Sequence, residues 1–316
     1  MLCDSLIHVT RTESHAQARP CASQSKAPWH LQAISSRRPV GSTDTTTLKY
    51  TYNYNLPIGD GVDIYVIDSG VNLAHTEFEG RARYGWVAPG LYPADKTGHG
   101  THIAGLTAGK THGVAKNANI ISVKVIDQLG DWDDIIAGVN WVTGKVKSSG
   151  RPAIACLALE TNRRSEGINE AVNTLIDSGI TAVASAGNDA KDASDTSPGS
   201  VLDAIVVGAS DIKNNVAWSS NFGPSVTGFA PGVDITSAWI TGPNSTMRAS
   251  GGSQATAQVA GIAANWLSMY PYLSPAQIKS HFRSIATTGI LSGVPPGTSN
   301  VLVFNGYSTD PPLTSP

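Results

Sequence analysis

The sequence predicts an α/β fold in which a parallel β-sheet is sandwiched between helices, giving three layers. Short, nearly continuous apolar runs alternate along the chain with segments of helical periodicity. Runs of this kind are typical of strands buried on both faces, as in parallel sheets, and the alternation places helices over both faces. A chain of 316 residues can form one large α/β domain or two smaller ones, and we expect one.

The expected strands place polar residues at one edge of the sheet. The first ends in Asp68, and Asn188 follows the fourth. Ligands bind at the carboxyl ends of strands in such sheets, so this edge is the expected site. In chain order the strands are expected at 62–67, 118–126, 153–159, 181–186 and 204–210.

The expected helices carry recognisable start and stop signals. Segment 132–146 has helical periodicity, and 166–179 closes with Gly179 in a C-cap position. A helix from Ser253 to Tyr270 is apolar at helical spacing and small elsewhere, so it is expected to be buried with its N-terminus at the site. The segment from Ser274 to Gln277 reads as a capping box that starts another helix.

Four polar residues in chain order supply the parts of a serine hydrolase. Ser253 would be the nucleophile, and His99 would be the general base that takes its proton. Asp68 would orient and stabilise the imidazole. The Asn188 side-chain amide and the Ser253 backbone N–H would stabilise the oxyanion, helped by the positive end of the helix that starts there.

Each of these residues has a simpler interpretation when taken alone. Asp68 could be a turn residue, Asn188 a loop residue and Ser253 a helix N-cap. His99 and His102 have a spacing that could serve a metal, but no acidic or cysteine cluster accompanies them. All four residues in this order on a matching scaffold favour the catalytic interpretation.

Several motifs stand in a fixed order along the chain: APWHLQAISS, VIDSGV, HTEFEGRA, GHGTHIAG, GVAKNANI, SVKVID, SAGND, VVGASD and QVAGIAA. In this order they resemble the subtilase family, and in particular its fungal proteinase K-like branch. The resemblance runs from Ala27 to near Gly306, so it covers almost the whole chain. The resemblance implies a subtilisin-like fold and a serine endopeptidase that acts through an acyl-enzyme on polypeptide substrates. It further implies a separate inhibitory pro-domain, a monomer and an extracellular location.

The chain departs from the family pattern near the nucleophile and in the segment expected to form a wall of the specificity pocket. The family usually has Gly-Thr-Ser-Met where this chain has Gly251-Gly252-Ser253-Gln254. Relatives have Ser-Leu-Gly where it has Ala158, Leu159 and Glu160. Glu160 either narrows the pocket, or carries a charge that favours a basic or small residue, or points to solvent. The opposite wall would come from 129–132, including Gly130 and Asp131.

These departures from the family pattern suggest a second function. The alternative to the endopeptidase is a catalytically weak or inactive subtilase homologue that binds peptides, motivated by Gly252 and Glu160. An esterase is a minor third option, since the same acyl chemistry handles esters.

Composition argues against several other classes. A net charge of −2 and a pI near 6.4 give no basic footprint for nucleic acid or a membrane surface. No apolar run is long enough to span a bilayer. We expect no cofactor and no metal, because Thr227 stands near the position where the family has an acidic calcium ligand.

The termini and cysteines complete the expectations. We expect residues 1–26 to be an irregular leader or the remnant of a pro-segment, 27–308 the catalytic domain and 309–316 a short Pro-rich tail. No signal peptide is visible, because Asp4 and a short apolar run replace its usual basic and apolar regions. Cys3 and Cys21 fall in the leader and Cys156 in an apolar run, so no disulfide is expected.

Overall fold

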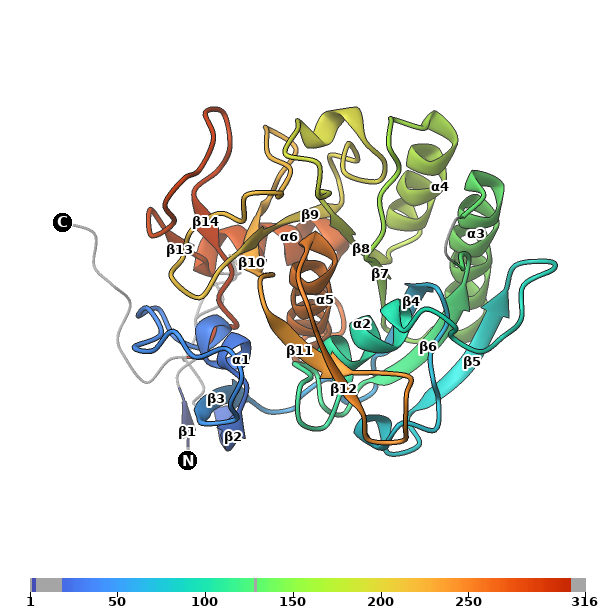
Figure 1. The fold of residues 1–316 in the computed structure, drawn as a ribbon. Coiled ribbons are helices and arrows are strands. Elements are labelled where there is room, and N and C mark those ends of the chain that lie inside the picture. The colour runs from blue at the N-terminus through green and yellow to red at the C-terminus, as the bar shows by residue number, and fades with distance from the viewer. Residues whose placement is uncertain (1, 4–18, 128–129, 308–316) are drawn as a thin grey trace.

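A central, mostly parallel β-sheet organises the chain. The computed structural model describes residues 2–3, 19–127 and 130–307. Within these residues the main sheet has nine strands, which run parallel except for the edge strand β13, which pairs antiparallel with β14 (Figure 1). From one edge to the other they are β13 (Thr287–Thr288), β14 (Val301–Leu302), β10 (Gly228–Pro231), β9 (Ile205–Ser210), β8 (Thr181–Ser185), β7 (Ala153–Leu157), β4 (Asp63–Asp68), β6 (Asn119–Lys124) and β5 (Ala82–Val87).

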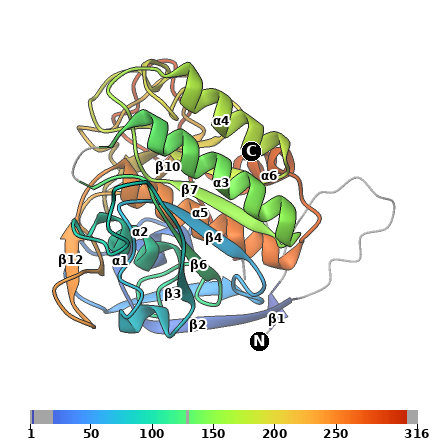
Figure 2. The same ribbon diagram turned by 90° about the vertical axis from the view of Figure 1, so that its right-hand side faces the viewer.

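Helices cover both faces of this sheet, so the expected three-layer α/β fold is confirmed. One face carries α2 (His99–Ala108), α5 (Gly252–Met269) and α6 (Pro275–Ile285). The other carries α3 (Trp132–Ser149) and α4 (Glu166–Asp177), which lie side by side (Figure 2). The short helix α1 (Trp29–Ile34) packs on β3 (Tyr50–Asn55), and the 3-10 turns are η1 (Thr76–Phe78) and η2 (Ala193–Asp195).

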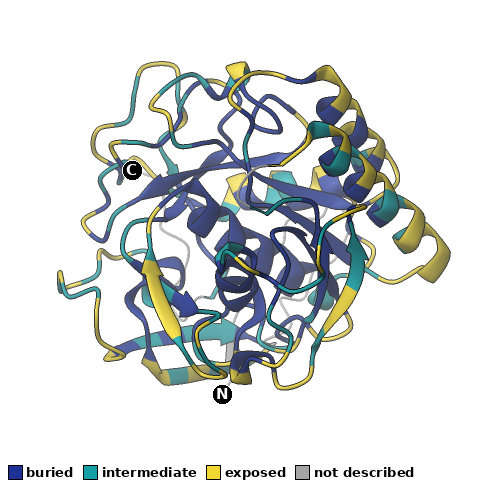
Figure 3. Ribbon diagram, turned by 45° about the vertical axis from the view of Figure 1, so that its right-hand side comes forward, coloured by how far each residue is buried: buried dark blue, intermediate teal, exposed yellow. Residues whose placement is uncertain are grey.

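The two hydrophobic cores follow from the alternation of side chains along the strands. In β4, Ile64 and Val66 join the core under α2 and α5, whereas Tyr65 and Ile67 join the core under α3 and α4. Every residue of α5 from Gly252 to Leu267 is buried, as its small and apolar composition predicts. Figure 3 shows the central strands buried and the outer helices exposed on one face only.

The helix boundaries confirm the capping signals. Ser274 and Gln277 form the expected capping box of α6, with Pro275 in its first turn. The Asp131 side chain caps α3 by accepting from the Asp133 N–H. Gly179 follows α4 with a φ of 88°, a left-handed conformation that favours glycine.

The expectation of an irregular leader is wrong for residues 19–26. They belong to β2 (Arg19–Ala27), which pairs antiparallel with β1 (Leu2–Cys3) and with β3. The segment is polar, so its strand is formed by backbone pairing that no apolar alternation reveals. Residues 1, 4–18 and the predicted tail at 309–316 lie outside the described residues.

The expectation of no disulfide is also wrong, because Cys21 is disulfide-bonded. Cys21 lies in β2, where pairing with β1 and β3 orders it, and the polar sequence of this segment did not predict a strand. Cys156 is free and buried in β7, as its apolar surroundings predicted.

Two further strands, β11 (Ile235–Ala238) and β12 (Thr246–Ala249), form a separate antiparallel ribbon. Within the described part of the chain, no helix has both the length and the apolar character needed to cross a membrane.

Candidate active site

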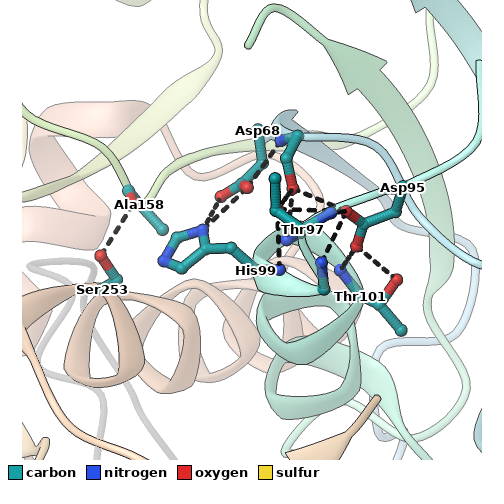
Figure 4. A network of polar contacts seen from close by, with 10 residues as sticks. Asp68, Asp95, Thr97, His99, Thr101, Ala158 and Ser253 are labelled. Atoms are coloured by element: carbon teal, nitrogen blue, oxygen red, sulfur yellow. Dashed lines mark hydrogen bonds and ion pairs between the residues drawn. The ribbon is translucent and has the colours of Figure 1, made fainter. Parts of the chain in front are cut away.

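The four predicted functional residues lie at the carboxyl edge of the sheet. Asp68 is the last residue of β4, and His99 is the first residue of α2. Asn188 lies in the turn after β8, and Ser253 lies in the first turn of α5. The ring of His99 lies between Asp68 and Ser253 (Figure 4). The parallel strands therefore bring together residues that are far apart in sequence.

Asp68 and His99 form a close pair. The Nδ1 atom of His99 lies 2.8 Å from Oδ1 of Asp68 and 2.9 Å from Oδ2. The Asp68 side chain is 1% exposed, whereas that of His99 is 36% exposed. A buried carboxylate on Nδ1 selects the tautomer that keeps the proton there, which leaves Nε2 free to accept a proton.

A second buried carboxylate, Asp95, supports the turn that precedes His99. Its Oδ1 accepts from the backbone N–H groups of Thr97 and Gly98 at 3.0 and 2.9 Å. Its Oδ2 accepts from the Thr101 N–H and hydroxyl at 2.9 and 2.7 Å. The Ser69 hydroxyl donates to Asp95 and accepts from the Gly100 N–H (Figure 4). This network links the ends of β4 and α2 and fixes their relative position.

Close backbone packing requires glycine within this network. A Cβ at Gly100 would lie 2.1 Å from the backbone oxygen of Gly70. Glycine next to His99 therefore allows α2 to start directly against the turn after β4.

Charge at the site favours the protonated imidazole. Burial alone would lower the pKa of His99, but the charge and hydrogen bond of Asp68 and the charge of Asp95 raise it above its ordinary value. His99 is therefore set up to hold a proton during a reaction and to return it.

The Ser253 hydroxyl is turned away from the imidazole. It donates to the backbone oxygen of Ala158 at 2.8 Å (Figure 4). Among the described residues, no hydrogen bond joins Ser253 to His99. A serine hydroxyl changes its direction by rotation about one bond, without a movement of the backbone. Catalytic hydrogen bonds are often formed only once substrate is bound.

The side chain of Asn188 is held by the backbone N–H of Gly252, the residue before Ser253. Its Oδ1 accepts from the Gly252 N–H at 2.7 Å, so the amide nitrogen faces the other side. This contact holds Gly252 in place, and a Cβ there would lie 2.7 Å from the Ser185 hydroxyl. The first turn of α5 is thus restrained by Asn188, although Gly252 itself is a flexible residue.

Glu160, for which a place in the pocket and an orientation towards solvent were both open, is half-buried and contacts Asn188. The Asn188 backbone N–H donates to both carboxylate oxygens at 3.0 Å, and its side-chain amide lies 3.4 Å from Oε1. A Cβ at Gly187 would lie 1.8 Å from Oε2, and Gly187 has a φ of 111°. Glycine at 187 therefore leaves the space that the carboxylate occupies.

The other predicted pocket residues contribute through their backbone or lie apart. The side chains of Ala158 and Leu159 are buried in the two cores, and the Ala158 carbonyl is what faces Ser253. Asp131 is exposed and its carboxylate caps α3. Gly130 forms a bridge with Ile126. The structure gives Gly130 and Asp131 no contact with Asp68, His99 or Ser253, and part of their segment, 128–129, lies outside the described residues.

Sequence reasoning did not identify Asp95, Ser69 and Thr97. Their signal was present, since Asp95 stands in a polar, glycine-containing turn directly before His99, and Ser69 directly follows Asp68. The contact of Ser253 with the Ala158 carbonyl could not be predicted in this way, because every residue has a backbone carbonyl and the sequence does not mark which one is used.

The described residues do not gather into a site for a metal ion. Among those described, no group of three His, Cys, Asp or Glu gathers in a way that could hold one. Thr227, near the expected calcium ligand, is fully buried and its hydroxyl accepts from the Val206 N–H. Nε2 of His102 contacts the backbone oxygens of Ile235 and Met247, so His102 links α2 to the ribbon of β11 and β12.

Comparisons with known proteins identify relatives of the chain. The subtilase family profile matches residues 59–302. The chain is 40% identical over 290 residues to the subtilase-type proteinase psp3 of Schizosaccharomyces pombe, covering 90% of this chain and 63% of psp3. It is 40% identical over 286 residues to alkaline protease 1 of Emericella nidulans, covering 90% of this chain and 69% of that protease.

A solved structure shows the same fold. A cold-adapted subtilisin-like serine proteinase superposes with a TM-score of 0.80 at 35% identity, covering 89% of this chain and 99% of that one. The chain spans less than two thirds of the length of psp3, which is therefore the longer protein.

Proposed function

Because the chain belongs to the subtilase family, we propose that it is a serine endopeptidase that hydrolyses polypeptides through an acyl-enzyme at Ser253. The observation that carries this proposal is the Asp68–His99 pair, with atoms 2.8 Å apart, at the sheet edge that also holds Ser253. The substrate would be an extended polypeptide, as for other subtilases.

The proposed reaction begins when the Ser253 hydroxyl turns from Ala158 to His99. His99 takes the proton from Oγ as Oγ attacks the substrate carbonyl carbon. Asp68 stabilises the resulting imidazolium, and the Asn188 amide and the Ser253 N–H stabilise the oxyanion. His99 then gives its proton to the leaving amine. Water, activated by His99, hydrolyses the acyl-enzyme and restores Ser253.

The place of action and the partners form part of this proposal. We propose an extracellular enzyme, since a disulfide at Cys21 suits an oxidising compartment. It would act as a monomer and would be accompanied by a separate inhibitory pro-domain, as in the family.

The second candidate function is a peptide-binding homologue with weak or no activity. The observation that favours it is the Ser253 hydroxyl, which donates to Ala158 instead of His99. The two functions differ in whether Ser253 becomes nucleophilic when a substrate or an inhibitor binds.

Labelling with a fluorophosphonate separates the two functions. The protein and Ser253→Ala are treated with the probe, and casein cleavage is followed in parallel. The endopeptidase proposal predicts that the native protein is labelled and cleaves casein, and that both properties vanish in Ser253→Ala. A folded native protein that neither labels nor cleaves would overturn it in favour of the binding function.

A further inference from the structure

A closed ring of contacts surrounds the place where a substrate carbonyl would bind. Ser253 donates to the Ala158 carbonyl, and Glu160, two residues further, accepts from Asn188. Asn188 in turn accepts from Gly252, which precedes Ser253 in the chain. The segment 158–160 thus engages both the nucleophile and the residue that would stabilise the oxyanion.

The donors of Asn188 are already directed at a negative charge. The backbone N–H of Asn188 donates a hydrogen bond to both carboxylate oxygens of Glu160. The side-chain amide nitrogen of Asn188 lies 3.4 Å from Oε1 of the same carboxylate. A substrate oxyanion would compete with this carboxylate for the amide, and two negative charges would be brought close together. Glu160 therefore opposes the charge that develops in the proposed reaction.

Glu160 has no salt-bridge partner among the described lysines, arginines and histidines. The nearby Lys191 is engaged at 2.8 Å by Asp189 and at 3.0 Å by the Asn162 carbonyl. Burial raises the pKa of Glu160, and the charge of Asp189 raises it further, whereas the hydrogen bonds from Asn188 and the charge of Lys191 oppose this rise. The carboxylate would therefore gain from a positive group in direct contact with it.

We propose that Glu160 is a specificity-determining residue that restrains the site until a cationic substrate side chain binds next to the scissile carbonyl. A lysine or arginine there would pair with the carboxylate and draw it from Asn188, freeing the amide for the oxyanion. Recognition and activation would then be one event. This inference rests on the proposed endopeptidase function.

The geometry explains why the cation would come from the residue that supplies the scissile carbonyl. Ser253 Oγ must approach that carbonyl carbon, and Oγ lies 2.8 Å from the Ala158 backbone oxygen. The side chain of the same substrate residue must therefore lie close to segment 158–160. A neutral side chain would leave Glu160 on Asn188, so a neutral substrate would react more slowly.

Matched peptide p-nitroanilides test the inference. They differ only in the residue before the scissile bond, which is lysine, its uncharged counterpart norleucine, or glutamate. The values of kcat and KM are measured for the native protein, Glu160→Gln and Glu160→Ala. Glu166→Gln is the control, because it removes the same charge from an exposed residue at the start of α4 that pairs with Arg164. Thermal unfolding confirms that each variant is folded, and fluorophosphonate labelling confirms that Ser253 is reactive in it.

The expected result is a charge-dependent exchange of preference. The native protein and Glu166→Gln should prefer lysine over norleucine in kcat/KM by on the order of tenfold or more. In Glu160→Gln and Glu160→Ala this preference should disappear, and kcat for the norleucine peptide should rise. The glutamate peptide should gain most.

Two results would overturn the inference. One is an unchanged ratio of lysine to norleucine in folded, labelled Glu160 variants. The other is an equal fall of kcat for all three peptides, which would make Glu160 only a support for Asn188. If the native protein is neither labelled nor active on any peptide, the proposed function itself fails. Labelling therefore distinguishes the two failures.

Discussion

At the scale of single residues, the proposed chemistry depends on which proton each side chain holds. Asp68 is almost fully buried and holds Nδ1 of His99 at 2.8 Å, so the imidazole has one tautomer available for the reaction. Asn188 is held equally firmly through Gly252. The two residues make different contributions, one to the base and one to the oxyanion, and substitutions separate them.

Replacing Asp68 by asparagine should abolish most activity while the fold is kept. The amide would favour the tautomer with the proton on Nε2, where His99 cannot accept from Ser253, so kcat should fall by about 10⁴-fold. Steady-state kinetics on a chromogenic peptide would measure the effect, with thermal unfolding as the control for folding. A fall of less than tenfold would contradict the proposed role of Asp68.

Replacing Asn188 by alanine should remove one oxyanion donor. We expect kcat to fall by about 10²- to 10³-fold with little change in KM, because the interaction is made mainly in the transition state. Saturation kinetics would separate the two constants. An increase in KM at constant kcat would instead assign Asn188 to substrate binding.

At the scale of elements, the turn at 95–101 couples the end of β4 to the start of α2. Asp95 accepts from several donors of this turn, and its charge contributes to the raised pKa of His99. Asp95 therefore acts through His99 and is a positioning residue. Its removal should change both the geometry and the titration of the imidazole.

Replacing Asp95 by asparagine should move the acid limb of the pH profile. Activity requires neutral His99, so kcat/KM falls as the pH drops through the pKa of His99, which lies above its ordinary value in the native protein. Loss of the negative charge disfavours the imidazolium, so the limb should shift to lower pH. Profiles of kcat/KM for both proteins would show the shift; a limb that stays in place or moves to higher pH would contradict the role.

The elements differed in how far the sequence predicted them. Strands β4, β6, β7, β8 and β9 were predicted because they are continuous apolar runs, and α6 was predicted by its capping box. Strand β2 was missed because it is polar and is formed by pairing with β1 and β3. The neighbouring strands β13 and β14, at one end of the sheet, have two residues each and are too short for any periodicity.

The candidate site was predicted from residue types at element ends. Asp68 ends a strand, Asn188 follows one, and His99 and Ser253 lie at helix starts, and the structure brings these four residues to one edge of the sheet. The contact between Glu160 and Asn188 could not be predicted, because it depends on a left-handed turn at Gly187 that leaves space for a carboxylate. Three interpretations of Glu160 were open, and only the atomic positions show that its half-buried carboxylate is held by Asn188.

At the scale of the whole molecule, the buried carboxylate of Glu77 contributes to the stability of the fold in acid. Glu77 lies in η1, and its Oε2 accepts from the Thr111 and His112 N–H groups at 2.9 and 3.0 Å. Burial alone would raise the pKa of Glu77, but these bonds and the His112 side chain lower it to about 2. Because the folded pKa is lower than the unfolded one, the charged form stabilises the fold.

Replacing Glu77 by glutamine should flatten the pH dependence of stability. In the native protein this contribution is complete above the unfolded pKa near 4.5 and is lost as the pH falls towards 2. It amounts to roughly 3 kcal/mol in the free energy of unfolding. Urea unfolding at a series of pH values would give the difference between the two proteins. A difference that stays constant from pH 6 to 2 would contradict it.

Trapping the acyl-enzyme tests the central claim most directly. The protein would be mixed with a slowly deacylating peptide ester, quenched in acid and digested, and the modified peptide identified by mass spectrometry. We predict a burst of one leaving group per active site and an acyl group on Ser253 alone, with neither in His99→Ala. Hydrolysis without a burst, or an acyl group on another residue, would contradict the account.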